Sequence, residues 1–200
     1  MAAGPGATVV AMVELAPPHL RFHRSFLDAV DEFIAGGEER YSGVLVWPAD
    51  EYFPGVAFTR EGLEEPAEFQ RLVDLHLADA EPNSPRPGGW VPCTYLWMAE
   101  GDTFLGSISL RHSLDNPMLA EVGGHIGYSV RPSARGRGLA ADALGQVVAL
   151  AADRGLDRVL VTCDLDNLAS ARTIERSGGV YEGDLKGKRR YWITTHTVTR

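Results

Sequence analysis

Arg135-Gly136-Arg137-Gly138-Leu139-Ala140 lies between an apolar segment, 123–130, and a long amphipathic segment, 139–154. The pattern predicts a strand, a tight turn and a helix in that order. The two glycines allow a sharp bend that points several backbone N–H groups at one place. The first turn of the helix adds unpaired N–H groups and the positive end of its dipole. We therefore predict a pyrophosphate-binding turn, with Arg135 and Arg137 adding positive charge.

Three kinds of phosphate site compete for this turn. A P-loop requires Gly, four residues and then Gly-Lys-Ser/Thr, which the chain lacks. Gly136-x-Gly138-x-x-Ala141 comes near the dinucleotide fingerprint. That fold needs further βαβ units, and the 60 or so residues that follow have room for only one crossover (roughly 30 residues or more per unit). The context therefore favours the third kind, a coenzyme A site.

The elements along the chain predict an α/β protein with a mixed sheet. Helices are expected at 19–35, 66–80, 139–154 and 167–177. Strands are expected at 9–15, 94–99, 104–111, 123–130, 158–163, 180–182 and 189–195, and 38–66 is expected to be irregular. The order implies one parallel crossover, from the strand before Arg135 to the strand after the helix.

The chain resembles the GNAT superfamily of N-acetyltransferases. Arg135-x-x-Gly138-x-Ala140 matches the Gln/Arg-x-x-Gly-x-Gly/Ala signature, and Glu175-Arg176-Ser177-Gly178-Gly179 is similar to its closing motif. Further runs resemble a bacterial subgroup of predicted small-molecule acetyltransferases, namely Gly88-Gly89-Trp90-Val91-Pro92, Arg111-His112-Ser113-Leu114, Gly123-Gly124-His125-Ile126-Gly127-Tyr128 and Arg190-Tyr191-Trp192-Ile193. The resemblance implies a mostly antiparallel sheet with a splayed parallel strand pair and flanking helices. It implies one domain, 1–200, with acceptor-side elements at 8–92 and an acetyl-CoA-binding core at 93–195.

The resemblance also implies how acetyl-CoA is held. Backbone of Tyr128, Ser129 and Val130 should pair with the pantetheine arm as an added strand does. The turn's N–H groups should hold the pyrophosphate; the residues are Arg135, Gly136, Arg137, Gly138, Leu139 and Ala140. Asn167 should contact the pantetheine and also cap a helix, with Ser170 near the far end of the cofactor. Many family members place a general acid, Tyr, where this chain has Ile174, so the acid is unassigned, with Tyr128 and Tyr181 nearby.

Amine acetylation needs a neutral amine beside the thioester and a route for its proton. Our first candidate for the base is His125, in the middle of the predicted strand 123–130. The alternative role for His125 is a hydrogen bond to a neighbouring strand. Glu121 is the second candidate base, and His112 on the adjacent predicted strand is the third. No metal is expected, because Cys93 and Cys163 match no ligand spacing.

The acceptor is expected to bind against the first half of the chain. The segment that joins the first two helices is rich in acids and aromatics, namely Glu38, Glu39, Tyr41, Trp47, Asp50, Glu51, Tyr52 and Phe53. Acids with aromatics suit a cationic amine, whereas a solvated loop is the plain alternative. A small-molecule amine is our leading acceptor. A protein N-terminus or lysine is a second, and a non-catalytic module that senses acetyl-CoA is a third.

Composition narrows the remaining choices. The chain has 200 residues and a formal charge of −8, which makes nucleic acid a poor partner. The charge is uneven: residues 1–100 carry 16 acids against 6 Lys and Arg, whereas 101–200 carry 11 against 13. No apolar run is long enough to span a bilayer and no signal peptide is recognised, so a cytoplasmic location is expected. Homodimer formation is compatible with these features.

Overall fold

The computed structural model describes residues 12–51 and 53–195. Its centre is a seven-stranded sheet in the order β1-β4-β5-β6-β7-β9-β8. The strands are β1 (Glu14–Ala16), β4 (Cys93–Glu100), β5 (Thr103–Arg111), β6 (Ile126–Val130), β7 (Arg158–Asp164), β8 (Val180–Leu185) and β9 (Lys188–Thr194). Neighbouring strands run antiparallel except for β6 and β7, which run parallel. The predicted fold class and its one parallel crossover are confirmed.

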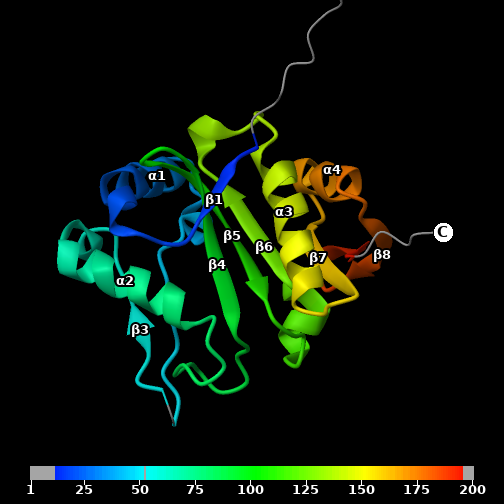
Figure 1. Cartoon of the computed structure of the whole chain (residues 1–200), viewed down its shortest axis with the longest axis horizontal. Helices are drawn as coiled ribbons and strands as arrows, with labels where there is room; N and C mark the ends of the chain where they lie inside the picture. The colour runs from blue at the N-terminus through cyan, green and yellow to red at the C-terminus, as the bar shows by residue number, and fades with distance from the viewer. Residues whose placement is uncertain (1–11, 52, 196–200) are drawn as a thin grey trace, which may run out of the picture.

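Helices cover both faces of the sheet (Figure 1). On one face, α1 (His23–Ala35) and α2 (Pro66–Ala78) share a buried cluster with Trp97 and Phe104. On the other face, α3 (Leu139–Asp153) packs over a cluster that includes Leu105 and Val161. The short helix α4 (Leu168–Arg176) follows β7 and lies beside α3. Two apolar layers therefore sandwich the sheet, as alternating side chains on its strands require.

The four predicted helices are present with shifted ends. The first begins later than expected, because Leu20–Phe22 forms a 3-10 turn in which the His19 side chain accepts a hydrogen bond from the N–H of Arg21 at 3.0 Å. The second begins at Pro66, a position where the missing N–H of proline costs nothing. The third is followed by Gly155 at φ 80°, a left-handed residue of the kind that ends helices.

The start of β6 differs from the prediction of a strand over 123–130. Leu119–Gly123 forms a π-helical turn instead, and the N–H of Gly124 donates to the Leu119 carbonyl at 2.8 Å. Gly124 has φ 68°, and a Cβ at this position would lie 2.6 Å from the Leu160 carbonyl oxygen. The close approach of β7 therefore forces a left-handed glycine here and shortens the strand.

Two further differences lie in the first half of the chain. The segment expected to be irregular contains a small hairpin, β2 (Val46–Trp47) and β3 (Val56–Ala57), too short to show an alternating pattern. The predicted strand 9–15 is described only from residue 12, and its visible part is β1, which pairs with β4 through Leu15 and Met98. Residues 9–11 lie outside the described residues.

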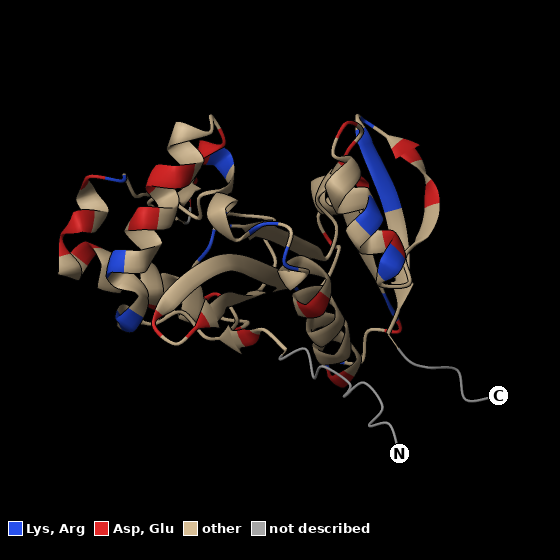
Figure 2. Cartoon of the chain, turned by 90° about the horizontal axis from the view of Figure 1, so that it is seen from above, with Lys and Arg blue, Asp and Glu red and all other residues tan. Residues whose placement is uncertain are grey.

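Charged residues gather on particular elements of the fold. Figure 2 shows acidic residues on α1 and α2 and a run of basic residues at the start of β9. Acidic residues of β8 lie beside this basic run, and each side of the molecule carries both signs of charge. Within the described ranges, no helix has the length and apolar character needed to cross a membrane.

Candidate active site

A cavity of about 560 Å³ opens between the turn 135–140, the end of β6 and the start of α4. Its walls include ten of the residues that the sequence predicts for cofactor binding, namely Tyr128, Ser129, Val130, Arg135, Gly136, Gly138, Leu139, Ala140, Asn167 and Ser170. Arg137 of the same set lies outside the wall. The structure thus brings the predicted cofactor-binding residues together around one space.

The turn has the geometry of an anion site. Gly136 and Gly138 have φ 78° and 82°, and a Cβ at either position would meet nothing within 4 Å. The helix bonds of α3 begin with the N–H groups of Ala141 and Asp142, which both donate to the Gly138 carbonyl. The N–H groups of Leu139 and Ala140 are therefore left without partners inside the helix, at its positive end. The turn can accept a phosphate without displacing a side chain.

Both arginines of the turn are paired with carboxylates. Arg135 donates to Glu38 through Nη1 at 2.9 Å and through Nη2 at 2.6 Å. Arg137 pairs with Glu100, at the end of β4. Glu38 lowers the net charge that Arg135 offers to a ligand, and the hydrogen bonds from Arg135 lower the pKa of Glu38. A bound phosphate must therefore compete with Glu38 for this guanidinium.

The parallel strands separate beside the cavity. β6 and β7 are in register at one pair only, Ile126 with Val161. Beyond it, residues 128–130 of β6 stay paired with β5 on one edge and line the cavity on the other. An unpaired strand edge can bind an extended ligand by main-chain hydrogen bonds. The gap between β6 and β7 therefore offers the kind of free backbone edge that a pantetheine arm requires.

Three polar residues lie where the gap between β6 and β7 reaches α4. Asn167 caps the helix, and its Oδ1 accepts a hydrogen bond from the N–H of Ser170 at 3.0 Å. The hydroxyls of Ser170 and Tyr128 lie 2.7 Å apart. Burial raises the pKa of Tyr128 to about 12, so its phenol stays protonated at neutral pH. This pair can deliver a proton to a leaving group within the cavity.

A second cavity of about 390 Å³ adjoins the first. It lies over the sheet, with walls from β4, β5, β6, β7 and the segment after α1. The two cavities share Tyr41, Tyr128, Ser129, Asn167 and Ser170. A molecule in the second cavity would therefore touch the same hydroxyl pair as a molecule in the first, which is the arrangement that direct transfer between two substrates needs.

The structure places His125, the first candidate base, away from both cavities. The residue precedes β6 and is 5% exposed, and its Nδ1 accepts a hydrogen bond from the N–H of Leu160 at 2.9 Å. A neutral imidazole has one acceptor nitrogen, which is occupied here. Burial, with a smaller effect of Arg111, lowers the pKa of His125 to about 4. His125 lines neither cavity and bonds a neighbouring strand, the alternative role foreseen from the sequence.

The other two candidate bases also lie outside the cavities. The Glu121 carboxylate pairs with Lys186 on the β8–β9 turn. His112 Nε2 lies 2.8 Å from the Thr94 hydroxyl, and burial together with the nearby Arg154 lowers the pKa of His112 to about 4. Neither residue belongs to a cavity wall, so the three proposed bases are not brought together with the cofactor-binding residues.

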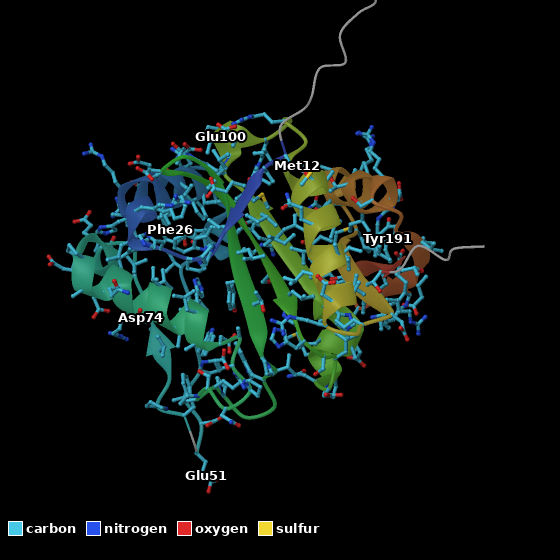
Figure 3. All side chains as sticks on the ribbon, in the orientation of Figure 1. Met12, Phe26, Glu51, Asp74, Glu100 and Tyr191 are labelled. Carbon is cyan, nitrogen blue, oxygen red and sulfur yellow. The ribbon has the colours of Figure 1, made fainter. Side chains whose placement is uncertain are left out.

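The acidic segment after α1 does not form the expected acidic pocket. Glu38 lies in the first cavity beside Arg135, and Asp50 accepts hydrogen bonds from the N–H groups of Gly88 and Phe53. Figure 3 shows Glu51 at the far tip of the β2–β3 loop, away from α3 and α4. Of the segment's acids and aromatics, only Tyr41 lines the second cavity among the described residues, and Tyr52 is not described.

Sequence reasoning missed two functional candidates and named a third, Tyr41, only as part of the acidic and aromatic segment. Thr173 and Arg176 line the first cavity, and Tyr41 lies at the junction of the two cavities. Thr173 and Arg176 follow Ser170 at intervals of three along α4, so helical spacing was a signal for both. Tyr41 reaches the site through a long-range hydrogen bond to Asp164 at 3.1 Å, which no local pattern announces.

The fold and these joined cavities are those of an acyltransferase built to hold a coenzyme A ester. A family model described as an acetyltransferase (GNAT) domain matches residues 49–180. This match covers more than half of the chain, which therefore belongs to the GNAT acetyltransferase family, whose members are acyl-CoA-dependent N-acetyltransferases. None of the curated proteins compared by sequence matches the chain.

Solved structures show the same fold at low identity. The microcin C7 self-immunity acetyltransferase MccE, in complex with acetyl-CoA and AMP, is 16% identical at a TM-score of 0.60 and covers 94% of this chain and 96% of its own. RimL, a ribosomal L7/L12 α-N-protein acetyltransferase in complex with coenzyme A, is 18% identical at 0.56, covering 93% and 96%. A chimera of the Vibrio cholerae spermidine N-acetyltransferase SpeG and hSSAT is 12% identical at 0.54, covering 92% and 96%.

Proposed function

We propose that this chain transfers the acetyl group of acetyl-CoA to the primary amine of a small molecule, by direct attack in a ternary complex. The observation that carries the proposal is the shared wall of the two cavities, at Tyr128 and Ser170. A thioester in the first cavity and an amine in the second would be held together beside one hydroxyl pair. Holding two reactants in place is worth a large part of such a barrier.

The balance of the reaction assigns tasks to the residues at this wall. The amine nitrogen forms a bond to the thioester carbon and releases one of its protons to solvent, the carbon–sulfur bond breaks, and the thiolate takes a proton. The Tyr128–Ser170 pair is our candidate donor of that proton. The turn 135–140 would hold the pyrophosphate, and residues 128–130 would pair with the pantetheine arm. No metal enters this scheme.

The attacking amine must lose a proton before transfer. Among the described residues of the second cavity, Asp164 is the one carboxylate. The hydrogen bond from Lys188 lowers the pKa of Asp164, so this group is a weak base. We therefore propose that solvent deprotonates the amine, and that the residues of the wall orient it.

A small acceptor is favoured over a protein acceptor by the segment after α1. The Tyr41 hydroxyl donates to Asp164 at 3.1 Å, and Arg40 lies 3.5 Å from the same carboxylate. These contacts fasten the segment across one side of the second cavity. A polypeptide acceptor needs an open groove at that place. A protein N-terminus or lysine is thus the second candidate, and a sensor of acetyl-CoA is the third.

Thiol release from acetyl-CoA tests the proposal. The purified chain is mixed with acetyl-CoA and a panel of small amines, amino acids, peptides with free N-termini and lysine peptides. Release with small amines and not with peptides is expected, with mass spectrometry confirming the acetylated product. Release confined to peptides would make the protein acceptor the better assignment. Binding of acetyl-CoA by calorimetry with no release for any amine would favour the sensor.

A further inference from the structure

The second cavity is basic, which bears on the acceptor if the proposed function holds. The ionisable groups in its wall are Arg40, Arg111 and Lys188 against Asp164, together with tyrosines and one cysteine. The phosphate-binding turn 135–140 lines only the other cavity, so these positive charges do not serve the cofactor's diphosphate. Their excess therefore acts on whatever molecule occupies the second cavity.

The single acid of this wall is already neutralised. Lys188 Nζ lies 2.5 Å from one oxygen of Asp164, and the Tyr41 hydroxyl and Arg40 contact the other. These groups satisfy the carboxylate from both sides and lower its pKa. A substrate ammonium would have to displace them, which makes Asp164 a poor anchor for a cation.

Arg111 is the opposite case, a cation without a partner acid. Its Nη1 donates to the carbonyls of Gly123 at 3.2 Å and Gly124 at 3.1 Å, which fixes the plane of the guanidinium. Among the described residues, no carboxylate forms an ion pair with it, and Asp79 nearby is held by Arg86 at 3.1 Å. A rigid guanidinium in a cavity wall is suited to a planar or tetrahedral oxyanion.

The strands around Arg111 leave its face open. Ser107 and Ser109 point from β5 to the same side of the sheet as Arg111, because side chains alternate along a strand. On β6 the residue opposite Ser109 is Gly127, where a Cβ would lie 3.7 Å from Nη1 and 3.8 Å from Nη2 of Arg111. Any larger residue at this position would therefore cover the guanidinium, whereas glycine exposes it to the cavity.

We propose that the acceptor carries an oxyanion near its amine, and that Arg111 binds this oxyanion with Lys188 and Arg40 adding attraction. The substrate class is thus an amino acid or another amine that bears a carboxylate or phosphate group, and not a polycation such as a polyamine. A charge-assisted pair of this kind gives a preference on the order of 10- to 100-fold over the uncharged analogue.

Matched pairs of acceptors test this inference. Thiol release is compared for L-amino acids and their carboxamides, and for phosphoethanolamine and ethanolamine, with spermidine as the polycation. We expect kcat/KM to favour the anionic member of one pair by at least about tenfold, and the favoured pair tells carboxylate from phosphate. A preference for the anionic member in neither pair, or better use of spermidine than of every anionic amine, would overturn the inference while leaving acetyl transfer in place.

Two variants test whether Arg111 causes the preference for anionic acceptors. Arg111→Gln removes the charge, and Gly127→Val covers the guanidinium while leaving its hydrogen bonds to residues 123 and 124. Both should reduce the anionic preference about tenfold or more, whereas Arg71→Gln, the same charge change on the exposed side of α2, should leave it intact. A preference that survives in Gly127→Val would contradict the assignment.

If no amine is turned over, the inference is tested by calorimetric binding of the matched pairs to the CoA-loaded protein. Binding of neither member, or of both members equally, in both pairs overturns the inference.

Discussion

The Glu38 carboxylate accepts two hydrogen bonds from the Arg135 guanidinium, at 2.9 Å and 2.6 Å. Glu38 follows α1, and Arg135 lies in the turn 135–140, so the pair joins the segment after α1 to the turn before α3. Bidentate pairs of this kind are among the stronger polar contacts. In the proposed complex, the Glu38 carboxylate therefore competes with the diphosphate of the cofactor for the Arg135 guanidinium.

Replacing Glu38 should tighten coenzyme A binding. Glu38→Gln frees Arg135 for the ligand, and an exposed pair is worth about 0.5–1 kcal/mol, so the Kd should fall about 2- to 5-fold. Calorimetry at low and high salt measures it, and the gain should shrink as salt screens the charges. Glu39→Gln, one residue on and exposed, is the matched control. Weaker binding in Glu38→Gln would show that Glu38 positions Arg135 instead.

The hydroxyl pair should affect turnover more than binding. Tyr128→Phe and Ser170→Ala should each lower kcat on the order of 100-fold, the usual effect of losing a general acid, with little change in the Kd of coenzyme A. The double variant should lose little more than either single one, because the two groups act as a unit. Tyr181→Phe removes an exposed hydroxyl elsewhere and should be silent. A rate unaffected in both variants would rule the pair out as proton donor.

The pH dependence of the rate should follow the acceptor and not a histidine. His125 and His112 have pKa values lowered to about 4, and neither lines a cavity. Because the neutral amine is the nucleophile, kcat/KM should rise with pH until it reaches the pKa of the acceptor's ammonium. Acceptors of different basicity should shift the profile accordingly. A break near pH 6.5 that is common to all acceptors and is lost in His125→Gln would restore His125 as base.

The buried histidine of α2 should make stability depend on pH. His76 is 4% exposed, stacks on Tyr95, and burial lowers its pKa from 6.5 to about 3. The unfolded chain therefore takes up a proton below about pH 6.5 that the folded chain refuses until about pH 3, so stability falls as pH falls through this window. His76→Phe keeps the stacked ring and removes the unpartnered Nδ1. Urea unfolding at pH 7 and pH 5 should show the variant's relative stability rising at the lower pH, and a constant difference would contradict the sign.

Gly124 should tolerate no side chain. Gly124→Ala combines a left-handed backbone with a Cβ 2.6 Å from the Leu160 carbonyl oxygen, so unfolding free energy should drop by about 1–3 kcal/mol or more. Gly145→Ala is the matched control, since a Cβ inside α3 would meet nothing within 4 Å. That change should stabilise the helix by about 0.5–1 kcal/mol. Equal effects of the two substitutions in thermal unfolding would refute the steric account.

Much of the fold was predictable because the signals were local. The glycines of the turn, Gly155 after α3 and the apolar periodicity of the helices each specify backbone geometry within a few residues. The same holds for the predicted cofactor-binding residues, which come from one turn, one strand end and one helix start. Local chemistry therefore sufficed to place all but Arg137 around one cavity.

The acceptor side was not predictable for a corresponding reason. Composition suggested an acidic pocket from the segment after α1, yet Glu38 pairs with Arg135, 97 residues away, and Tyr41 bonds Asp164, 123 residues away. His125 was chosen as a base from its residue type and its place in a predicted strand, and neither shows that its Nδ1 accepts the N–H of Leu160. Which partner a charged or polar group finds depends on tertiary contacts that no local pattern contains.

The two cavities share some of their wall residues and differ in the others. Five residues line both cavities, so under the proposed function a substitution among them would alter donor and acceptor binding together. Arg40, Arg111 and Lys188 line the second cavity alone. Substitutions at these few positions, in nature or in laboratory evolution, can therefore change which amine is acetylated. The residues proposed to bind the thioester would stay the same.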